Sequence, residues 1–159
     1  MSIRSTVKAI ILNENKILLN KCYDKYNGEY FTLPGGGQNV YETLQETLVR
    51  ECIEETGYSV IPIRFAALCE EICDNIEFRD KYPEYVHKVI HIFICHLSSE
   101  TFKQPIEQDS MQIACEWISI DQLKDISILP KVVNDNIQVL IGCDTPLFLG
   151  SEHIPYNHG

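Results

Sequence analysis

The sequence contains no hydrophobic run long enough to cross a membrane or to form a signal peptide. Its first apolar stretch, residues 7–12, is interrupted by Lys8, whereas a membrane-spanning helix needs roughly 20 apolar residues. We therefore expect a cytoplasmic protein with no membrane partner.

Basic residues are also few. The chain has 13 Lys and Arg against 23 Asp and Glu, which gives a net charge of −10 at pH 7. Proteins that bind nucleic-acid polymers draw most of their sequence-independent affinity from Lys and Arg on phosphates, so we expect no polymer partner. A small phosphate compound can still bind if a metal ion supplies the positive charge.

The cysteines do not have the spacing of a zinc site. They are seven in number and scattered, and Cys69 and Cys73 stand four apart without a second pair downstream. We expect reduced thiols that pack as small hydrophobic side chains. One zinc alternative stays open, because His87, His91 and Cys95 would share one face of a strand, although adjacent strands would have to complete the ligand shell.

Nothing in the chain marks a boundary between domains. No internal repeat, low-complexity segment or linker interrupts it, and 45% hydrophobic and 23% charged residues are ordinary for a globular protein. A chain of 159 residues can bury one sizeable core, whereas two domains would each be marginal. We expect a single domain over residues 1–159.

Hydrophobic periodicity predicts an α/β domain with helices packed on a mixed sheet. Apolar, β-branched runs between turn residues predict the strands, and longer stretches with a helical apolar stripe predict the helices. The predicted strands are residues 6–12, 16–20, 30–33, 59–71, 86–97 and 113–118. The predicted helices are residues 42–56 and 130–142, and residues 73–85 are expected to form no regular element.

Short local signals mark the helix ends. Gly57 suits the left-handed residue that ends many helices, and Pro130 suits the first turn of the last helix. Ser119 and Gln122 have the spacing of a capping box, which predicts a short helix beginning there. The buried stripe of the first helix is predicted to be Leu48, Val49, Cys52 and Ile53.

Three glutamates of the first helix share one of its faces. Glu54 and Glu55 lie three and four positions after Glu51, so all three fall within about 100° around the helix axis. Their mutual repulsion destabilises the helix unless a cation lies between them. Oxygen ligands suit Mg²⁺, which one or two carboxylates typically hold together with substrate phosphates. A solvated acidic face would explain the glutamates alone, but not the pattern around them.

That pattern has fixed spacing. Gly36 is followed after five residues by Glu42, and after seven more by Arg-Glu-Cys-Ile-Glu-Glu-Thr-Gly at residues 50–57. The pattern resembles the Nudix box, the signature of hydrolases that act on a nucleoside diphosphate linked to another moiety. All the charged and glycine positions match, whereas Cys52 and Tyr58 stand where aliphatic residues are usual.

The resemblance covers most of the chain. It extends upstream to Phe-Thr-Leu-Pro-Gly-Gly-Gly at residues 31–37, and more loosely downstream to residues 116–118 and Leu123. Residues 143–159 lie outside it and are expected to form a C-terminal tail.

The resemblance implies a Nudix-type α/β/α sandwich with a mixed β-sheet. It also implies a Nudix pyrophosphohydrolase that depends on Mg²⁺, with Mn²⁺ as an alternative metal. The residues that resemble its metal ligands, one of which polarises the attacking water, are Glu51, Glu54 and Glu55. Arg50 joins them in the catalytic set. The residues that resemble its structural loop and helix positions are Gly36, Gly37, Glu42 and Gly57.

Residues outside the box are expected to set the substrate. Glu107 and Glu116 are candidates for an extra acid or base, although polar loop positions explain both equally well. Aromatic side chains between two predicted strands could stack on a nucleobase, or else anchor a loop or a dimer contact. These aromatic residues are Phe78, Tyr82 and Tyr85.

The expected substrates are nucleoside triphosphates, ADP-ribose and other nucleotide sugars, and dinucleoside polyphosphates. The alternative function is a nucleotide-binding module of the same fold without turnover. Because dimers are common in the family, a homodimer is the assembly that the resemblance suggests.

Overall fold

The computed structural model describes residues 2–98 and 111–158. The strands are β1 (Arg4–Asn13), β2 (Lys16–Asp24), β3 (Gly28–Thr32), β4 (Gly35–Gly37), β5 (Val60–Cys73), β6 (His87–Leu97), β7 (Gln112–Ser119) and β8 (Leu147–Ile154). The helices are α1 (Leu44–Thr56), α2 (Ile76–Lys81), the 3₁₀ helix η1 (Ile120–Asp125) and α3 (Lys131–Gly142). None of these helices in the described ranges is long and apolar enough to cross a membrane.

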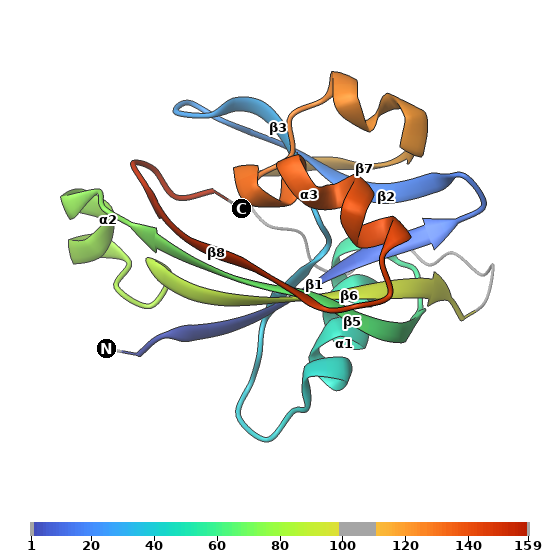
Figure 1. The fold of residues 1–159 in the computed structure, drawn as a ribbon. Helices are drawn as coiled ribbons and strands as arrows, with labels where there is room; N and C mark the ends of the chain where they lie inside the picture. Colours follow the sequence, from blue (N-terminus) through green and yellow to red (C-terminus); the bar gives the residue numbers. More distant parts are fainter. Residues whose placement is uncertain (1, 99–110, 159) are drawn as a thin grey trace.

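The strands form one mixed sheet. Its order is β3-β2-β1-β6-β5-β8, with β4 paired to β1 and β7 paired to β2. The β1–β6 and β5–β8 pairs are parallel, and the other pairs are antiparallel. α1 lies on one face of the sheet and α3 on the other (Figure 1). The predicted α/β fold with a mixed sheet is therefore confirmed.

β1 separates two apolar clusters because its side chains alternate between the faces of the sheet. One cluster joins Val7 and Ala9 of β1 to Leu48 of α1, whereas Ile10 packs in the other with Val133 of α3. All five side chains are fully buried. β1 thus contributes side chains to the apolar core on both faces of the sheet.

α1 begins at Leu44 because Thr43 caps it. The Thr43 hydroxyl accepts a hydrogen bond from the Glu46 N–H at 3.1 Å, and the Glu46 carboxylate accepts one from the Thr43 N–H at 2.8 Å. At the other end Gly57 has φ 78°, and its N–H bonds the Ile53 carbonyl. The predicted helix is correct within two residues. In its predicted stripe Leu48 and Cys52 are fully buried, and Val49 and Ile53 are half-buried.

Two local predictions are wrong. Residues 73–85 were expected to lack regular structure, but they contain α2, whose N-cap Asn75 accepts a hydrogen bond from Phe78 N–H. The predicted capping box at Ser119 does not form, since its side chain makes no cap hydrogen bond and the segment that follows is the 3₁₀ helix η1. Pro130 was expected in the first turn of the last helix, but it is the N-cap of α3, which begins one residue later at Lys131.

The C-terminal segment is part of the sheet. Residues 143–159 were expected to form a tail, but they include β8, which extends the sheet beside β5. After β8 the chain turns back towards β3 (Figure 1), where Asn27 Nδ2 donates to the Asn157 carbonyl at 3.3 Å. The chain end therefore crosses one face of the sheet.

Candidate functional site

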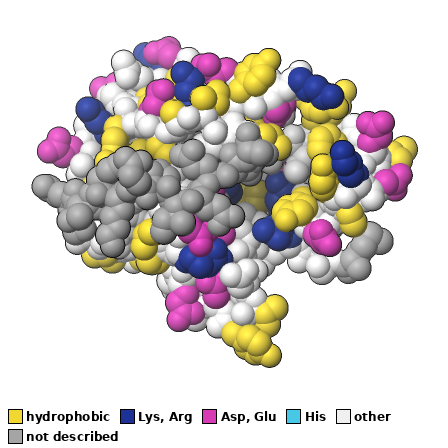
Figure 2. All heavy atoms as spheres, turned by 180° about the vertical axis from the view of Figure 1, so that it is seen from behind, with side chains coloured by type: hydrophobic (Ala, Val, Ile, Leu, Met, Phe, Trp, Pro, Cys, Tyr) yellow, Lys and Arg dark blue, Asp and Glu magenta, His cyan; other side chains and the backbone are white. Residues whose placement is uncertain are grey.

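A cavity of about 890 Å³ lies on the face of the sheet that packs against α3, and residues of α1 reach its wall beside β4. Its wall includes residues of β1, β2, β4, β6, α1 and α2, and also the chain end at residues 157 and 158. On the face of the molecule in Figure 2, Lys and Arg side chains lie beside Asp and Glu side chains around a hollow. The glycine bend, residues 35–37, meets four predicted residues of the first helix in this cavity: Arg50, Glu51, Glu54 and Glu55. Glu42 and Gly57 are not in its wall.

The three glycines of β4 are required by close packing. Gly35 has φ +141°, and a Cβ there would collide with the Val7 carbonyl. A Cβ on Gly36 would lie 2.5 Å from Cδ of Glu51, and one on Gly37 would collide with the Arg4 guanidinium. The bend therefore lets α1 carboxylates and β1 cations approach the same backbone.

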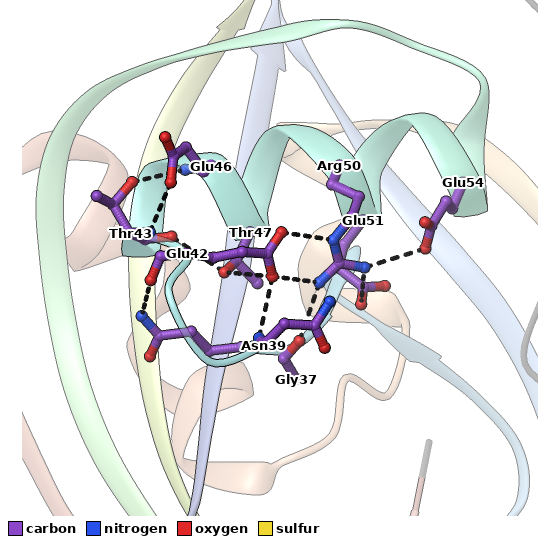
Figure 3. A network of polar contacts seen from close by, with 10 residues as sticks. Gly37, Asn39, Glu42, Thr43, Glu46, Thr47, Arg50, Glu51 and Glu54 are labelled. Carbon is purple, nitrogen blue, oxygen red and sulfur yellow. Dashed lines mark hydrogen bonds and ion pairs between the residues drawn. The ribbon is translucent and has the colours of Figure 1, made fainter.

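Arg50 connects the bend to α1 (Figure 3). Its Nε and Nη2 donate to the two Glu42 carboxylate oxygens at 2.7 and 2.8 Å, and Nη2 also donates to the Gly37 carbonyl at 3.2 Å. Nη1 donates to Glu51 at 2.9 Å and to Glu54 at 3.3 Å. Arg50 therefore holds the Glu51 and Glu54 carboxylates in place, and Glu42 holds Arg50.

Glu42 is the charged anchor of this network. The hydrogen bonds from Arg50 and from the Asn39 N–H lower the pKa of Glu42 from 4.5 to about 2. The Arg50 pKa is raised, chiefly by its hydrogen bond to Glu42. The pair therefore stays ionised at neutral pH.

The side chains of Glu51 and Glu55 are partly buried. Glu55 Oε2 accepts hydrogen bonds from the Gly35 N–H at 2.8 Å and from Asn20 Nδ2 at 3.2 Å. Burial raises the pKa of Glu55 from 4.5 to about 7 and also raises the pKa of Glu51. Two carboxylates that lose solvation in one cavity favour a cation between them.

The donor set fits a hard divalent ion. Glu51, Glu54 and Glu55 all line the cavity and offer oxygen atoms. Across residues 2–98 and 111–158, no three His, Cys, Asp or Glu side chains are already gathered around one point. Carboxylate oxygens are the ligands that suit Mg²⁺, which takes few protein ligands and completes its shell with water and substrate phosphates.

The sheet side of the cavity is basic. Arg4, Thr6 and Lys8 alternate along β1 and line the cavity, and Arg4 pairs in register with Lys88 of β6. Lys8 Nζ donates to the Gly35 carbonyl at 3.3 Å, close to Glu55. The sequence analysis missed these cations, because only the alternation along β1 is visible locally and the β1–β6 pairing joins distant segments.

Only some of the candidate residues outside the Nudix box lie in the cavity wall. Phe78, Tyr82 and Tyr85 do line the cavity. Glu116 is not in its wall: its side chain is 43% exposed and lies 3.6 Å from Lys21 Nζ. Glu107 lies outside the described residues.

The zinc alternative does not form. His87 Nε2 lies 2.7 Å from a Glu70 carboxylate oxygen, whereas His91 Nδ1 lies 3.1 Å from the Thr6 carbonyl oxygen. Cys95 is fully buried in the apolar cluster under α1. Four residues along a strand span roughly 13 Å, so each of these side chains has a separate environment.

Comparison with known proteins gives one family and one fold. A family model described as NUDIX domain matches residues 2–140. A protein of Caenorhabditis elegans described as putative nudix hydrolase 1 is 28% identical over 108 residues, which are 68% of this chain and 25% of that protein. The chain thus spans about a quarter of the length of this curated relative.

Solved structures share the architecture. A mutator MutT protein from Bacillus halodurans superimposes with a TM-score of 0.72 at 18% identity, over 96% of this chain and 91% of that chain. An ADP-ribose pyrophosphatase from Streptococcus suis superimposes with a TM-score of 0.61 at 21% identity, over 95% of this chain and 100% of that chain. At these identities the likeness shows the fold.

Proposed function

The chain belongs to the NUDIX domain family, and from this premise we propose that it hydrolyses a diphosphate linkage in a nucleoside diphosphate joined to another moiety, with Mg²⁺ as cofactor. The observation that carries the proposal is that Glu51, Glu54 and Glu55 line one cavity beside the glycine bend. Mn²⁺ is the alternative metal.

The three carboxylates would hold the metal. When bound, a divalent ion makes a coordinated water more acidic and neutralises charge that develops on the phosphate oxygens. The fit rests on the donor set, because three carboxylates that are partly or largely shielded from water need a positive charge nearby.

The chain's own residues orient the reaction. Arg50 fixes Glu51 and Glu54, and Glu42 fixes Arg50 in turn. The bend at Gly36 has no side chain, so a phosphate can approach its backbone closely. One carboxylate of the α1 set then positions the attacking water and accepts its proton.

The aromatic side chains in the wall would bind the nucleoside. Phe78 and Tyr82 have ring centroids 6.1 Å apart, and Tyr85 lies beneath Arg4, with 4.7 Å from Arg4 Cζ to the ring centroid. Exposed aromatic faces in a cavity suit stacking with a base. One solved relative is described as an ADP-ribose pyrophosphatase, which supports nucleotide sugars as candidates beside nucleoside triphosphates and dinucleoside polyphosphates.

The test pairs Glu54→Gln with Glu46→Gln on the same helix. Glu46 is exposed and caps α1, and Gln preserves a capping box. We expect Glu54→Gln to lower Mg²⁺-dependent turnover by at least about 10²-fold with an unchanged circular dichroism spectrum. Glu46→Gln should retain turnover.

The assay uses a panel of nucleoside diphosphate compounds with and without EDTA. Normal turnover in Glu54→Gln, or hydrolysis that EDTA does not affect, would contradict the metal site. Tight binding of a nucleotide without any turnover by the wild-type protein would favour the non-catalytic module.

A further inference from the structure

The carboxylates of the described cavity wall all lie on one of its sides. Across the described parts of the chain, every carboxylate in the wall comes from α1, namely Glu51, Glu54 and Glu55. The opposite side carries Arg4 and Lys88 and no carboxylate. A substrate that fills the cavity therefore meets a second, positively charged environment.

A buried carboxylate outside the cavity wall contacts Lys88 and His158. Glu71 is 2% exposed, and its Oε2 lies 2.7 Å from His158 Nε2 while its Oε1 lies 3.5 Å from Lys88 Nζ. Lys88 and His158 line the cavity, whereas Glu71 does not. The hydrogen bond from His158 and the charge of Lys88 lower the pKa of Glu71 against the effect of burial.

Arg4 adds a second basic side chain, whereas burial lowers the pKa of Lys88. Its guanidinium lies over the Tyr85 ring and against Gly37, and Arg4 is the cross-strand neighbour of Lys88. Together Arg4 and Lys88 carry two positive charges, and Glu71 carries one negative charge. An uncompensated charge in a partly buried wall is unfavourable, and a bound anion would compensate it.

Lys88 lies apart from the carboxylates that would hold the metal, whereas Arg4 reaches from β1 to Gly37 between them. β4 and β6 flank β1 on opposite sides, so their backbones lie about two strand spacings apart, roughly 10 Å. Lys88 points further towards β5, where it meets Glu71. A nucleoside placed between Lys88 and these carboxylates would share the cavity with Phe78, Tyr82 and Tyr85.

His158 near the C-terminus also lines this side of the cavity, and it lies outside the residues that the family model matches. His158 follows the matched residues 2–140 by 18 positions and is only 6% exposed. Tyr156 stacks on Tyr26 with a centroid distance of 4.3 Å and an interplanar angle of 11°. These contacts place His158 beside the buried Glu71.

We propose that Arg4, Lys88 and His158 form a subsite for a phosphate monoester that the substrate carries away from the hydrolysed diphosphate. The subsite rests on the proposed function and narrows it to nucleoside diphosphate derivatives with one further phosphate. Glu71 acts as a positioning residue, since it holds Lys88 and His158 at the wall.

The test compares compounds that differ by one phosphate monoester: coenzyme A against 3′-dephospho-coenzyme A, and NADPH against NADH. We expect kcat/KM to be about tenfold higher for the phosphorylated member of at least one pair, mainly through KM. Arg4→Gln should reduce this preference to about twofold or less. The control Lys124→Gln removes an exposed charge outside the cavity and should keep the preference.

Lys88→Met is the second variant, and its melting temperature is measured first because it removes one partner of Glu71. If it folds, it should also lose the preference. Equal kcat/KM within both pairs, or an equal loss for all compounds in Arg4→Gln, would overturn the subsite and assign the cations to the diphosphate.

Calorimetric titration separates this inference from the proposed function. Adenosine 3′,5′-bisphosphate or adenosine 2′,5′-bisphosphate should bind about tenfold more tightly than AMP, and Arg4→Gln should remove the difference. If no compound is hydrolysed but this difference is present, the hydrolase proposal fails and the subsite stands. Hydrolysis without any preference and without this difference overturns the subsite alone.

Discussion

Neighbouring glycines of β4 are expected to respond differently to the same substitution. Gly35→Ala places a Cβ against the Val7 carbonyl at a positive φ, and neither backbone can move freely, so we expect a stability loss of about 1–3 kcal/mol or more. Gly36→Ala instead meets the end of the Glu51 side chain, which can turn aside. Turnover should then fall by about 10²-fold with little loss of stability.

Urea unfolding and steady-state kinetics on the two variants check this contrast. A Gly36→Ala protein with full turnover would show that Glu51 need not stay where α1 and Arg50 hold it.

The Glu42–Arg50 pair gives the protein a specific acid dependence. Because the Glu42 pKa falls from 4.5 to about 2 on folding, its contribution is fully present above pH 4.5 and is lost as the pH falls towards 2. We expect Glu42→Gln to lower the free energy of unfolding at pH 7 and to flatten its decline between pH 4.5 and 2. Unfolding curves at several pH values measure both effects, and identical slopes in the two proteins would contradict them.

At the residue scale, the sequence predicts well what depends on local spacing. The α1 glutamates, Arg50 and the glycine bend meet because turns of one helix and the adjoining loop bring them together. Arg4 and Lys88 lie 84 positions apart, and their proximity follows from strand pairing that no local pattern encodes.

At the scale of the element, α1 depends on its N-terminal cap. Thr43→Ala removes the hydroxyl that accepts the Glu46 N–H, and we expect a loss of about 1 kcal/mol in the free energy of unfolding. Thr43→Ser keeps the oxygen and should retain most of the stability. Turnover per folded molecule should be unchanged in both variants, since Thr43 is outside the cavity wall. Chemical denaturation at fixed pH measures the difference, and equal stability of the Ala and Ser variants would count against the cap.

Three elements escaped prediction: α2, β8 and the three-residue strand β4. α2 has only six residues, and Pro83 and several tyrosines follow closely, so helical periodicity is too short to recognise. β8 contains Gly150 and polar residues that are weak strand formers, but pairing with β5 supplies its hydrogen bonds. Long apolar strands such as β5 and β6 were predicted within two residues of their ends because their composition is unambiguous.

At the scale of the whole molecule, the cysteines test the packing of both layers. Five of the seven are buried, and only Cys115 and Cys143 are partly exposed. Burial raises the pKa of Cys69 and Cys95 to about 12 and that of Cys115 to about 11, which lowers the thiolate fraction. We expect an aromatic disulfide reagent at pH 8 to label Cys143 quickly and Cys115 slowly in the native protein.

In denaturant all seven thiols should react. Rapid labelling of most thiols without denaturant would mean that the two layers open readily or that the core is packed differently.

The pairing of β1 has a consequence for synthesis on the ribosome. β1 leaves the exit tunnel well before its parallel partner β6, which begins only at His87. At roughly 5–20 residues per second, the nascent strand waits on the order of several seconds for that partner. During this interval Arg4 and Lys8 give the unpaired strand like charges that oppose association with other polypeptides. The cations that line the cavity of the folded protein therefore also counteract aggregation of the nascent chain.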